Sequence, residues 1–229
     1  MKATFPVISA IVPSYNEGTR IVAVVTALKA ASHVSEVIVV DDGGNENSRA
    51  VLAKLPVKLI THERNKGKAQ AVLTGLIAAT SDVVLLIDGD LVGITPKIID
   101  DMVEKYWQSG CDLLLGDRQR EFAPLRLLGV SIATTGDRMC NRKLLLDNPH
   151  LFATSGYLPG YLLEPAMNKI FFHKYRVEKY VMVGVDQTNK IWKGGLSALV
   201  SDIKMHVLYC KYLGLSEYGW QCAFARNLK

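Results

Sequence analysis

Short hydrophobic runs alternate with amphipathic segments along the first half of the chain. The runs are rich in Val and Ile, and each ends at a polar cluster; they cover residues 7–12, 36–40, 57–61 and 82–87. The segments between them carry apolar residues at helical spacing, over about 19–28, 47–55 and 68–79. Strands that alternate with such helices are typical of a parallel sheet wound by right-handed crossovers. The pattern therefore predicts an α/β fold.

The second half of the chain is less regular. A helix is predicted from Pro96 to about residue 109, followed by an apolar strand over 112–115 that Gly116-Asp117-Arg118 is expected to end. Further on, the spacing predicts a helix over 158–172, a strand over 177–185 and a helix over 196–213. There is no internal repeat and no linker-like segment, so we predict one domain of 229 residues.

Composition narrows the class of protein. Hydrophobic residues make up 49% of the chain, and 27 basic against 22 acidic side chains give a net charge of +5. That excess suits an anionic ligand or a membrane surface, but it is too small to indicate nucleic acid. The four cysteines form no C-x-x-C pair, which favours reduced thiols without structural zinc. We recognise neither a signal peptide nor an apolar window of about 18 residues, so we expect a cytoplasmic protein that is soluble or peripheral to a membrane.

The most informative segment is Asp88-Gly89-Asp90, which directly follows the strand predicted over 82–87. In extended chain the two carboxylates share a face, roughly 7 Å apart at Cα, and Gly89 lets the backbone turn or approach a ligand closely. Such hard oxygen ligands suit a divalent cation and leave coordination sites for substrate phosphates. We therefore consider Asp88 and Asp90 candidate metal ligands.

Three polar clusters follow predicted strands, at residues 14–17, 41–42 and 88–90. In open parallel sheets, ligands bind at the carboxyl ends of the strands. Because all three clusters fall at such ends, their convergence carries more weight than any one motif. Each has an ordinary structural alternative, since acidic turns and helix caps are common at these places.

Four motifs in this order and spacing resemble the family 2 nucleotide-sugar glycosyltransferases. They are Ile-Val-Pro-Ser-Tyr-Asn-Glu at 11–17, Val-Val-Asp-Asp-Gly at 39–43, Asn-Lys-Gly-Lys at 65–68 and the Asp-Gly-Asp at 88–90. The resemblance covers roughly residues 5–120. It implies a GT-A fold, in which a Rossmann-like, mostly parallel twisted sheet is flanked by helices in a single domain. It also implies a UDP- or GDP-sugar donor with Mg²⁺ or Mn²⁺, a nucleotide-sugar-binding half at 1–115 and an acceptor-binding half with C-terminal helices at 116–229.

The resemblance also assigns expected roles to individual residues. A first group would line the pocket for the base and ribose, namely Pro13, Tyr15 and Glu17, with Asp41 or Asp42 accepting hydrogen bonds from the nucleoside. A second group would lie near the base, ribose, phosphates and metal, namely Gly67, Lys68, Asp88, Gly89 and Asp90, of which Asp90 would bind the metal itself. The resemblance leaves the third metal ligand unassigned.

The nature of the acceptor decides which catalytic groups are needed. A hydroxyl acceptor requires a general base, for which Glu164 and Asp117 are candidates. A lipid phosphate is already anionic and requires a basic pocket instead, and guanidinium groups suit phosphate. Arginines that could contribute gather in the second half, with Arg118 as the candidate nearest the motifs; the others are Arg120, Arg126, Arg138 and Arg142. Most such charge groups are merely solvated surfaces.

The segment from Leu91 to Pro96 resembles the polyprenol-phosphate sugar transferase branch, which includes dolichyl-phosphate mannosyltransferases. The expected acceptor is therefore a polyprenyl or dolichyl phosphate at the cytoplasmic membrane face, with the apolar and basic tail from residue 196 facing the lipid. A soluble or saccharide acceptor is the alternative. Two other classes stay open, a haloacid-dehalogenase-like phosphatase and a non-catalytic nucleotide-sugar-binding module. The oligomeric state is open as well, and a homodimer is compatible with the sequence.

Overall fold

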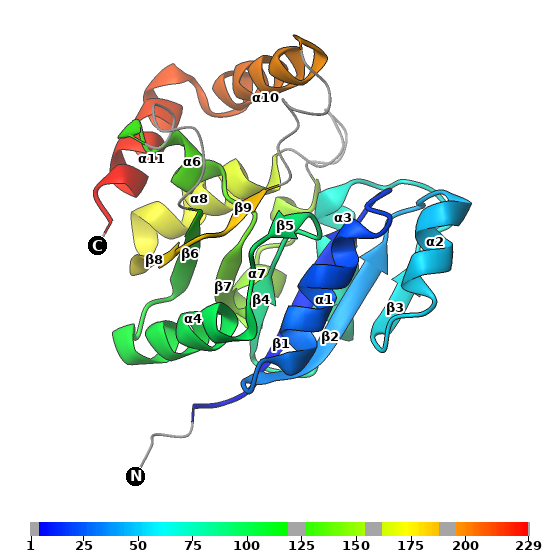
Figure 1. The fold of residues 1–229 in the computed structure, drawn as a ribbon. Coiled ribbons are helices and arrows are strands. Elements are labelled where there is room, and N and C mark those ends of the chain that lie inside the picture. The colour runs from blue at the N-terminus through cyan, green and yellow to red at the C-terminus, as the bar shows by residue number, and fades with distance from the viewer. Residues whose placement is uncertain (1–4, 119–126, 154–161, 188–195, 229) are drawn as a thin grey trace.

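A seven-stranded sheet with the order β3-β2-β1-β4-β7-β6-β8 runs through the chain (Figure 1). The computed structural model describes residues 5–118, 127–153, 162–187 and 196–228, with the backbone alone at 187 and 196–202. The strands are β1 (Ile8–Ser14), β2 (Val34–Asp41), β3 (Lys58–Thr61), β4 (Val83–Leu86), β6 (Leu113–Arg118), β7 (Arg138–Asn141) and β8 (Val177–Met182). All pairs in this sheet are parallel except those of β7, which is antiparallel to β4 and to β6. The predicted α/β class with a mostly parallel sheet is confirmed.

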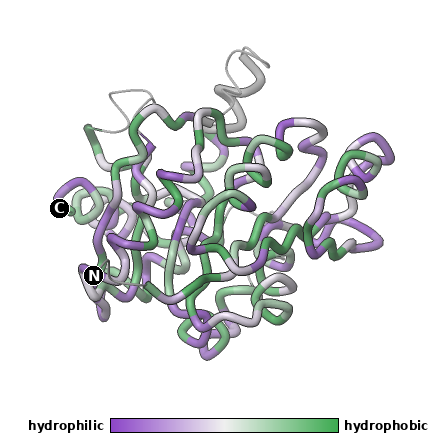
Figure 2. Tube along the Cα trace, turned by 60° about the horizontal axis from the view of Figure 1, so that its bottom comes forward, coloured by the Kyte–Doolittle hydropathy of each residue, from purple (hydrophilic) through white to green (hydrophobic). Residues whose placement is uncertain are grey.

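Helices cover both faces of this sheet. On one face, α1 (Arg20–Ala30) and α4 (Pro96–Ser109) bury one cluster of core side chains (Figure 1). On the other face, a second cluster is covered by α3 (Lys68–Ala78), α6 (Val130–Thr134), α7 (Arg142–Leu146), α8 (Leu163–Lys174) and α11 (Leu215–Arg226). Strand residues alternate between the clusters, since Ala10 and Val12 pack in the first and Ile11 in the second. Figure 2 shows the resulting alternation of hydrophobic segments and hydrophilic turns along the trace.

The remaining elements lie at the edges of the two layers. They are α2 (Glu46–Leu52), the 3-10 helix η1 (Pro149–Leu151), α10 (Leu196–Leu213) and a short antiparallel pair, β5 (Leu91–Val92) with β9 (Asp186–Gln187). Among the described helices, none is both long and apolar enough to cross a membrane.

Helix α3 lies unusually close to β1, which explains its small side chains. A Cβ atom added at Gly75 would lie 2.4 Å from Cγ2 of Ile11. Ala71 and Val72, on the same helix, are fully buried or nearly so. Because a larger residue at 75 would push α3 off the sheet, this glycine fixes the approach of the helix whose first residue is Lys68.

The elements predicted from the hydrophobic pattern are present, with three differences. The triplet Gly116-Asp117-Arg118 was predicted to end the strand, but it belongs to β6, which continues to Arg118. The strand predicted over 177–185 ends at Met182, because Gly184 has a φ of +82° that turns the chain. The helix predicted over 158–172 is described from Leu163 onward, and its first part lies outside the described residues.

The pattern missed β7, along with several short elements and α11, and β7 determines the shape of the sheet edge. Arg138, its first residue, pairs with Leu86 of β4 on one side and with Leu115 of β6 on the other. Because β7 runs against its neighbours, its first residue lies at their carboxyl ends. Residues just before β7 therefore lie at the edge where ligands of parallel sheets bind.

Candidate active site

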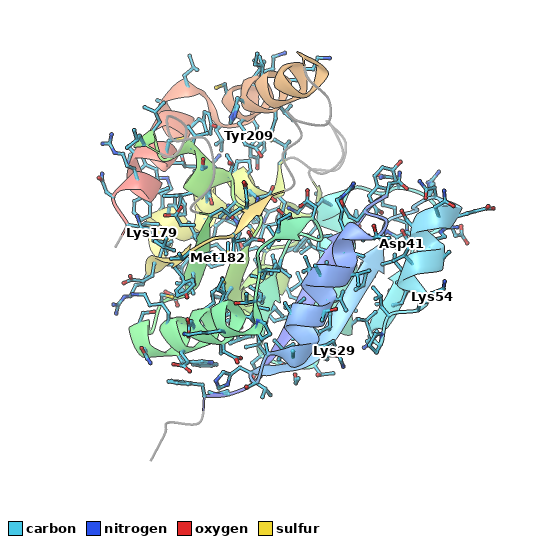
Figure 3. All side chains as sticks on the ribbon, viewed as in Figure 1. Lys29, Asp41, Lys54, Lys179, Met182 and Tyr209 are labelled. Atoms are coloured by element: carbon cyan, nitrogen blue, oxygen red, sulfur yellow. The ribbon has the colours of Figure 1, made fainter. Side chains whose placement is uncertain are left out.

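The carboxyl ends of the parallel strands bring the sequence motifs to one edge of the sheet. Figure 3 marks this edge with Asp41, the last residue of β2, whereas Lys29 at the end of α1 marks the opposite edge. Four candidate residues in or after β1, β2, β4 and β6 face the same region, namely Pro13, Asp42, Asp88 and Arg118. The convergence predicted from the sequence is thus present in the backbone topology.

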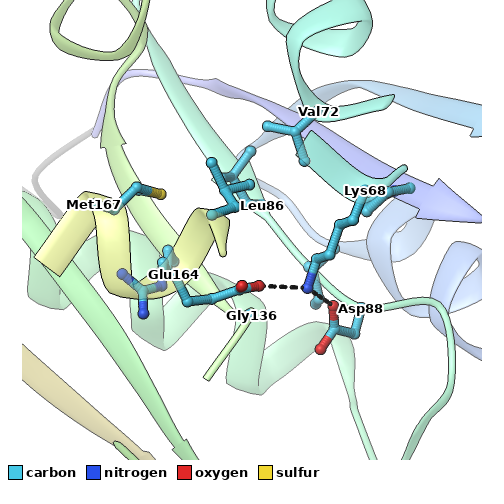
Figure 4. A pocket seen from close by; sticks show the side chains of 11 residues that line it. Lys68, Val72, Leu86, Asp88, Gly136, Glu164 and Met167 are labelled. Carbon is cyan, nitrogen blue, oxygen red and sulfur yellow. Dashed lines mark hydrogen bonds and ion pairs between the residues drawn. The ribbon is translucent and has the colours of Figure 1, made fainter. Parts of the chain in front are cut away.

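Asp88 is the centre of a network of buried and partly buried charges. Its Oδ1 accepts a hydrogen bond from Nζ of Lys68 at 2.7 Å, and its Oδ2 accepts one from a terminal nitrogen of Arg118 at 2.7 Å (Figure 4 shows the first pair). The Lys68 ammonium lies 2.7 Å from Oε1 of Glu164 as well. Lys68 therefore links the Asp-Gly-Asp motif after β4 to the first turn of α8.

Opposite charges outweigh burial in this network. Burial would raise the pKa of the Asp88 carboxyl, but the charges and hydrogen bonds of Lys68 and Arg118 hold it well below its usual range. Burial would likewise lower the pKa of Lys68, yet Asp88 and Glu164 raise it above its usual range. Both groups therefore stay charged at neutral pH, and the site holds fixed carboxylates and fixed cations at contact distance.

Asp137 completes the network and was not predicted from the sequence. It is fully buried just before β7, and its Oδ2 accepts a hydrogen bond from Nε of Arg118 at 2.6 Å. Its Oδ1 accepts the backbone N–H of Asp88 at 3.1 Å. A signal for it exists in the sequence, because Gly-Asp-Arg occurs twice, at 116–118 and 136–138. The two triplets lie side by side, and Gly116 donates its N–H to the Asp137 carbonyl.

The two aspartates after β2 are held by the surrounding backbone. Asp42 accepts hydrogen bonds from Nδ1 of His62 at 2.7 Å and from the amides of Lys66 and Gly67 at 2.8 and 2.7 Å. It therefore fixes the Asn-Lys-Gly-Lys segment that leads into α3. His62 is a second residue that the motif analysis missed.

Asp41 has a similar structural role in the neighbouring turn. It accepts the amide of Gly44 at 2.8 Å and Nε of Arg49 at 3.1 Å. Gly43 between the two aspartates has a φ of +75°, and a Cβ there would lie 2.4 Å from the backbone at 64–65. The turn and the 62–67 segment are thus packed directly against each other. Nucleoside binding by Asp41 or Asp42 stays a prediction, since both carboxylates already accept hydrogen bonds within the fold.

The remaining donor-side candidates surround the Asp-Gly-Asp loop. Tyr15 has half of its surface exposed, and Glu17 forms an ion pair with Arg20 at 2.8 Å. A Cβ at Gly89 would lie 3.5 Å from Cγ of Glu17, so the β1 motif and the Asp-Gly-Asp motif are neighbours. Asp90, at the end of that motif, is half-buried.

A small pocket lies beside Asp88, Lys68 and Glu164. It is lined by polar groups of the network and by apolar side chains from α3, β4 and α8 (Figure 4); the lining residues are Pro13, Lys68, Val72, Leu86, Ile87, Asp88, Gly136, Arg138, Leu163, Glu164 and Met167. Pro13 thus lies near Lys68, as the motifs predicted for residues of one site.

The described arginines of the predicted cluster, Arg118, Arg138 and Arg142, each have hydrogen-bond partners within the fold. Arg138 is buried and donates to the carbonyls of Thr135 and Ala133 and to Oδ1 of Asn168, so its guanidinium is used inside the fold. These contacts argue against the acceptor-phosphate role that the sequence suggested for it, because the sequence does not distinguish a buried arginine at the start of a strand from an exposed one. Arg142 donates to the carbonyl of Leu76, and Arg120 and Arg126 lie outside the described residues.

The two general-base candidates are both buried. Asp117 lies in β6 and Glu164 in the first turn of α8, next to Lys68. Within the described part of the chain, no three His, Cys, Asp or Glu side chains gather closely enough to hold a metal ion by themselves. Asp88 and Asp90 nevertheless fit a Mg²⁺ or Mn²⁺ ion that takes most of its ligands from a diphosphate and water. Metal binding by these two residues stays a prediction.

Comparisons with known proteins agree with this arrangement. Residues 9–166 match glycosyl transferase family 2. The chain is 31% identical over 119 residues to dolichol-phosphate mannosyltransferase of Pyrococcus furiosus, which covers 48% of this chain and 33% of the relative. It is 31% identical over 122 residues to dodecaprenyl-phosphate galacturonate synthase of Rhizobium johnstonii, which covers 49% and 36%. The chain thus spans about a third of the length of these two relatives.

The fold is also similar to a solved structure. Glucosyl-3-phosphoglycerate synthase of Mycobacterium tuberculosis, in complex with Mn²⁺, UDP and glucosyl-3-phosphoglycerate, superposes with a TM-score of 0.69 at 19% identity. The likeness covers 95% of this chain and 80% of that one. It confirms the GT-A fold that the four motifs predicted.

Proposed function

Because the chain belongs to glycosyl transferase family 2, we propose that it transfers a sugar from a UDP- or GDP-sugar to a phosphate-bearing acceptor, namely a polyprenyl phosphate at the cytoplasmic membrane face. The observation that carries this proposal is the placement of Asp88 between Lys68 and Arg118, both at 2.7 Å. A carboxylate and two cations at the carboxyl end of β4 are the groups that a metal–diphosphate requires.

The donor would lie along the strand ends that bring the motifs together. Tyr15 is exposed enough to cover a base or ribose, and Glu17 lies beside Gly89 at the Asp-Gly-Asp loop. The Asn-Lys-Gly-Lys segment, held by Asp42, would approach the phosphates with Gly67 and Lys68. The nucleoside would therefore bind over β1 and β2, with its diphosphate directed toward β4.

Breaking the sugar–phosphate bond leaves negative charge on the nucleoside diphosphate. Asp90 and Asp88 would hold the Mg²⁺ or Mn²⁺ ion, which neutralises that charge as a Lewis acid. Lys68 and Arg118 are held close to this place by their carboxylate partners, so a small shift toward the diphosphate would let them stabilise the leaving group.

The ion pair between Glu164 and Lys68 favours an acceptor that needs no general base. The Glu164 carboxylate forms this ion pair with Lys68 at 2.7 Å, so one of its oxygens is already occupied by an ammonium group instead of facing an acceptor hydroxyl. A phosphate oxygen is anionic and can attack the sugar without deprotonation. The names of the two relatives contain dolichol phosphate and dodecaprenyl phosphate, which supports the same class of acceptor.

Helix α10 offers a surface for the lipid. Its described part exposes Ile203 and Val207, at 54% and 48%, together with Lys204 and Lys211. Apolar side chains next to lysines suit the interface of an anionic membrane. We therefore place the acceptor-side membrane contact on α10.

The proposal is tested by incubating the protein and Mn²⁺ with UDP- and GDP-sugars, with polyprenyl phosphate in anionic vesicles or with a soluble saccharide as acceptor. We expect sugar transfer to the lipid phosphate from one nucleotide class. Asp90→Asn should abolish this transfer, whereas Asp147→Asn, which changes an exposed carboxylate directly after α7, should not.

The other outcomes distinguish the alternatives. Transfer to the saccharide alone would contradict the lipid acceptor. Absence of both transfer and donor hydrolysis would favour the binding module, and turnover of a generic phosphoester would favour a phosphatase.

A further inference from the structure

The buried carboxylate of Asp137 links the Asp-Gly-Asp motif after β4 to Arg118 at the end of β6. Its position follows from β7, whose antiparallel direction brings residue 137 between the carboxyl ends of β4 and β6. Each oxygen of the carboxylate serves one of those ends. Oδ1 accepts the backbone N–H of Asp88, and Oδ2 accepts Nε of Arg118.

This arrangement limits how Arg118 meets Asp88. A guanidinium prefers to bind a carboxylate through two parallel hydrogen bonds, which would cover both oxygens. Because Asp137 holds Nε at 2.6 Å, a terminal nitrogen of Arg118 reaches Oδ2 of Asp88 at 2.7 Å, while Oδ1 is left to Lys68. The carboxylate of Asp88 is thus held by two different cations from two directions.

The balance of charges also ties Asp137 to Asp88 and Arg118. Asp88 and Asp137 share Arg118, which is only 3% exposed, so removing either carboxylate leaves the guanidinium with less compensation. Asp137 lies behind Arg118 and the Asp88 backbone, and it contacts both.

We propose that Asp137 is a positioning residue that orients Arg118 and Asp88 for the metal–diphosphate of the donor. The inference rests on the proposed function, because it concerns the same site. Partners behind metal ligands typically change metal affinity by about 10- to 100-fold when they are altered. Asp137 would set the direction of the Asp88 carboxylate in the same way, through hydrogen bonds to its backbone and to its cationic partner.

The test is Asp137→Asn, which keeps the shape and removes the charge. Binding of UDP and GDP is measured by calorimetry as a function of Mn²⁺ concentration, and again with a chelator. We expect the Mn²⁺ concentration for half-maximal nucleotide binding to rise about 10- to 100-fold, with the metal-free affinity changed less than about threefold. The control is Asp100→Asn, a carboxylate that also accepts two backbone amides, those of Ser32 and His33, but far from the site.

The outcomes separate this inference from the proposed function. If the parent protein binds neither nucleotide with Mn²⁺, the proposed function fails. If the parent binds and Asp137→Asn shows the parental Mn²⁺ dependence, or the same change as Asp100→Asn, the positioning role fails. If Asp137→Asn does not fold, Asp137→Glu keeps the charge but displaces it by one methylene. A raised Mn²⁺ requirement in that variant supports positioning, and parental behaviour refutes it.

Discussion

Replacing Arg138 by methionine should destabilise the fold and leave phosphate binding intact. The guanidinium donates to the Thr135 carbonyl at 2.8 Å, to Oδ1 of Asn168 at 2.7 Å and to the Ala133 carbonyl at 3.0 Å. The Ala133 carbonyl also accepts Nδ2 of Asn168 at 2.7 Å, so it would stay bonded. Two buried acceptors would lose the donor that the structure gives them.

Each such acceptor costs about 1–3 kcal/mol when it loses its partner, and removing a buried charge offsets part of the loss. The free energy of unfolding should therefore fall by roughly 2–4 kcal/mol. The assay is urea denaturation followed by circular dichroism, in which the midpoint should fall while the slope stays unchanged. Arg142→Met removes one 3.3 Å bond to a carbonyl and should cost about 1 kcal/mol or less. The reasoning is refuted if Arg138→Met has parental stability and instead loses affinity for the phosphate acceptor.

Three other changes test the fold and its electrostatics. Gly75→Ala should lower stability by about 1–2 kcal/mol, because overpacking against the isoleucine beneath it outweighs the roughly 1 kcal/mol gained in helix propensity; thermal melts would show this. His62→Leu removes a donor to Asp42 and should cost about 1–3 kcal/mol in urea denaturation. Burial would raise the pKa of Glu36, but hydrogen bonds from two hydroxyls and an amide lower it below its ordinary 4.5. The stability that these hydrogen bonds give to the charged carboxylate is present above about pH 4.5 and is lost as the pH falls through the lowered pKa of the folded state. Glu36→Gln should therefore lose less stability than the parent as the pH falls below about 4.5, whereas the exposed Glu63→Gln, the control, should follow the parent.

The first half of the fold could be predicted from the sequence because its hydrophobic runs, turn residues and helix caps all indicate the same elements. Val- and Ile-rich runs of four to eight residues end in polar turns, and Thr95 with Pro96 begins α4 as capping rules predict. Since ligands bind at the carboxyl ends of such strands, the motifs could be assigned to one edge without coordinates.

The second half could not be read in the same way, for a physical reason. Strand β7 consists of Arg-Met-Cys-Asn, and its arginine is buried through contacts with residues 133, 135 and 168. Side-chain hydrogen bonds of this kind, two of them local and one to a residue 30 positions away, leave no periodic pattern. The direction of β7, and with it the position of Asp137, depends on pairing with two strands that are distant in the sequence. Helix α11 also lacks a clear apolar stripe, so its packing on α6 and α8 was not predicted.

Lys68 spans the two predicted halves of the protein, since one ammonium holds a carboxylate after β4 and another at the start of α8. A donor that draws this ammonium toward its phosphates would weaken the ion pair with Glu164, so donor binding in the first half would change the environment of a carboxylate in the second half. Thermodynamic reciprocity then requires an acceptor that disturbs Glu164 to alter donor affinity by the same factor. The two substrates would then bind as a coupled pair, with the coupling carried by the ammonium group of Lys68.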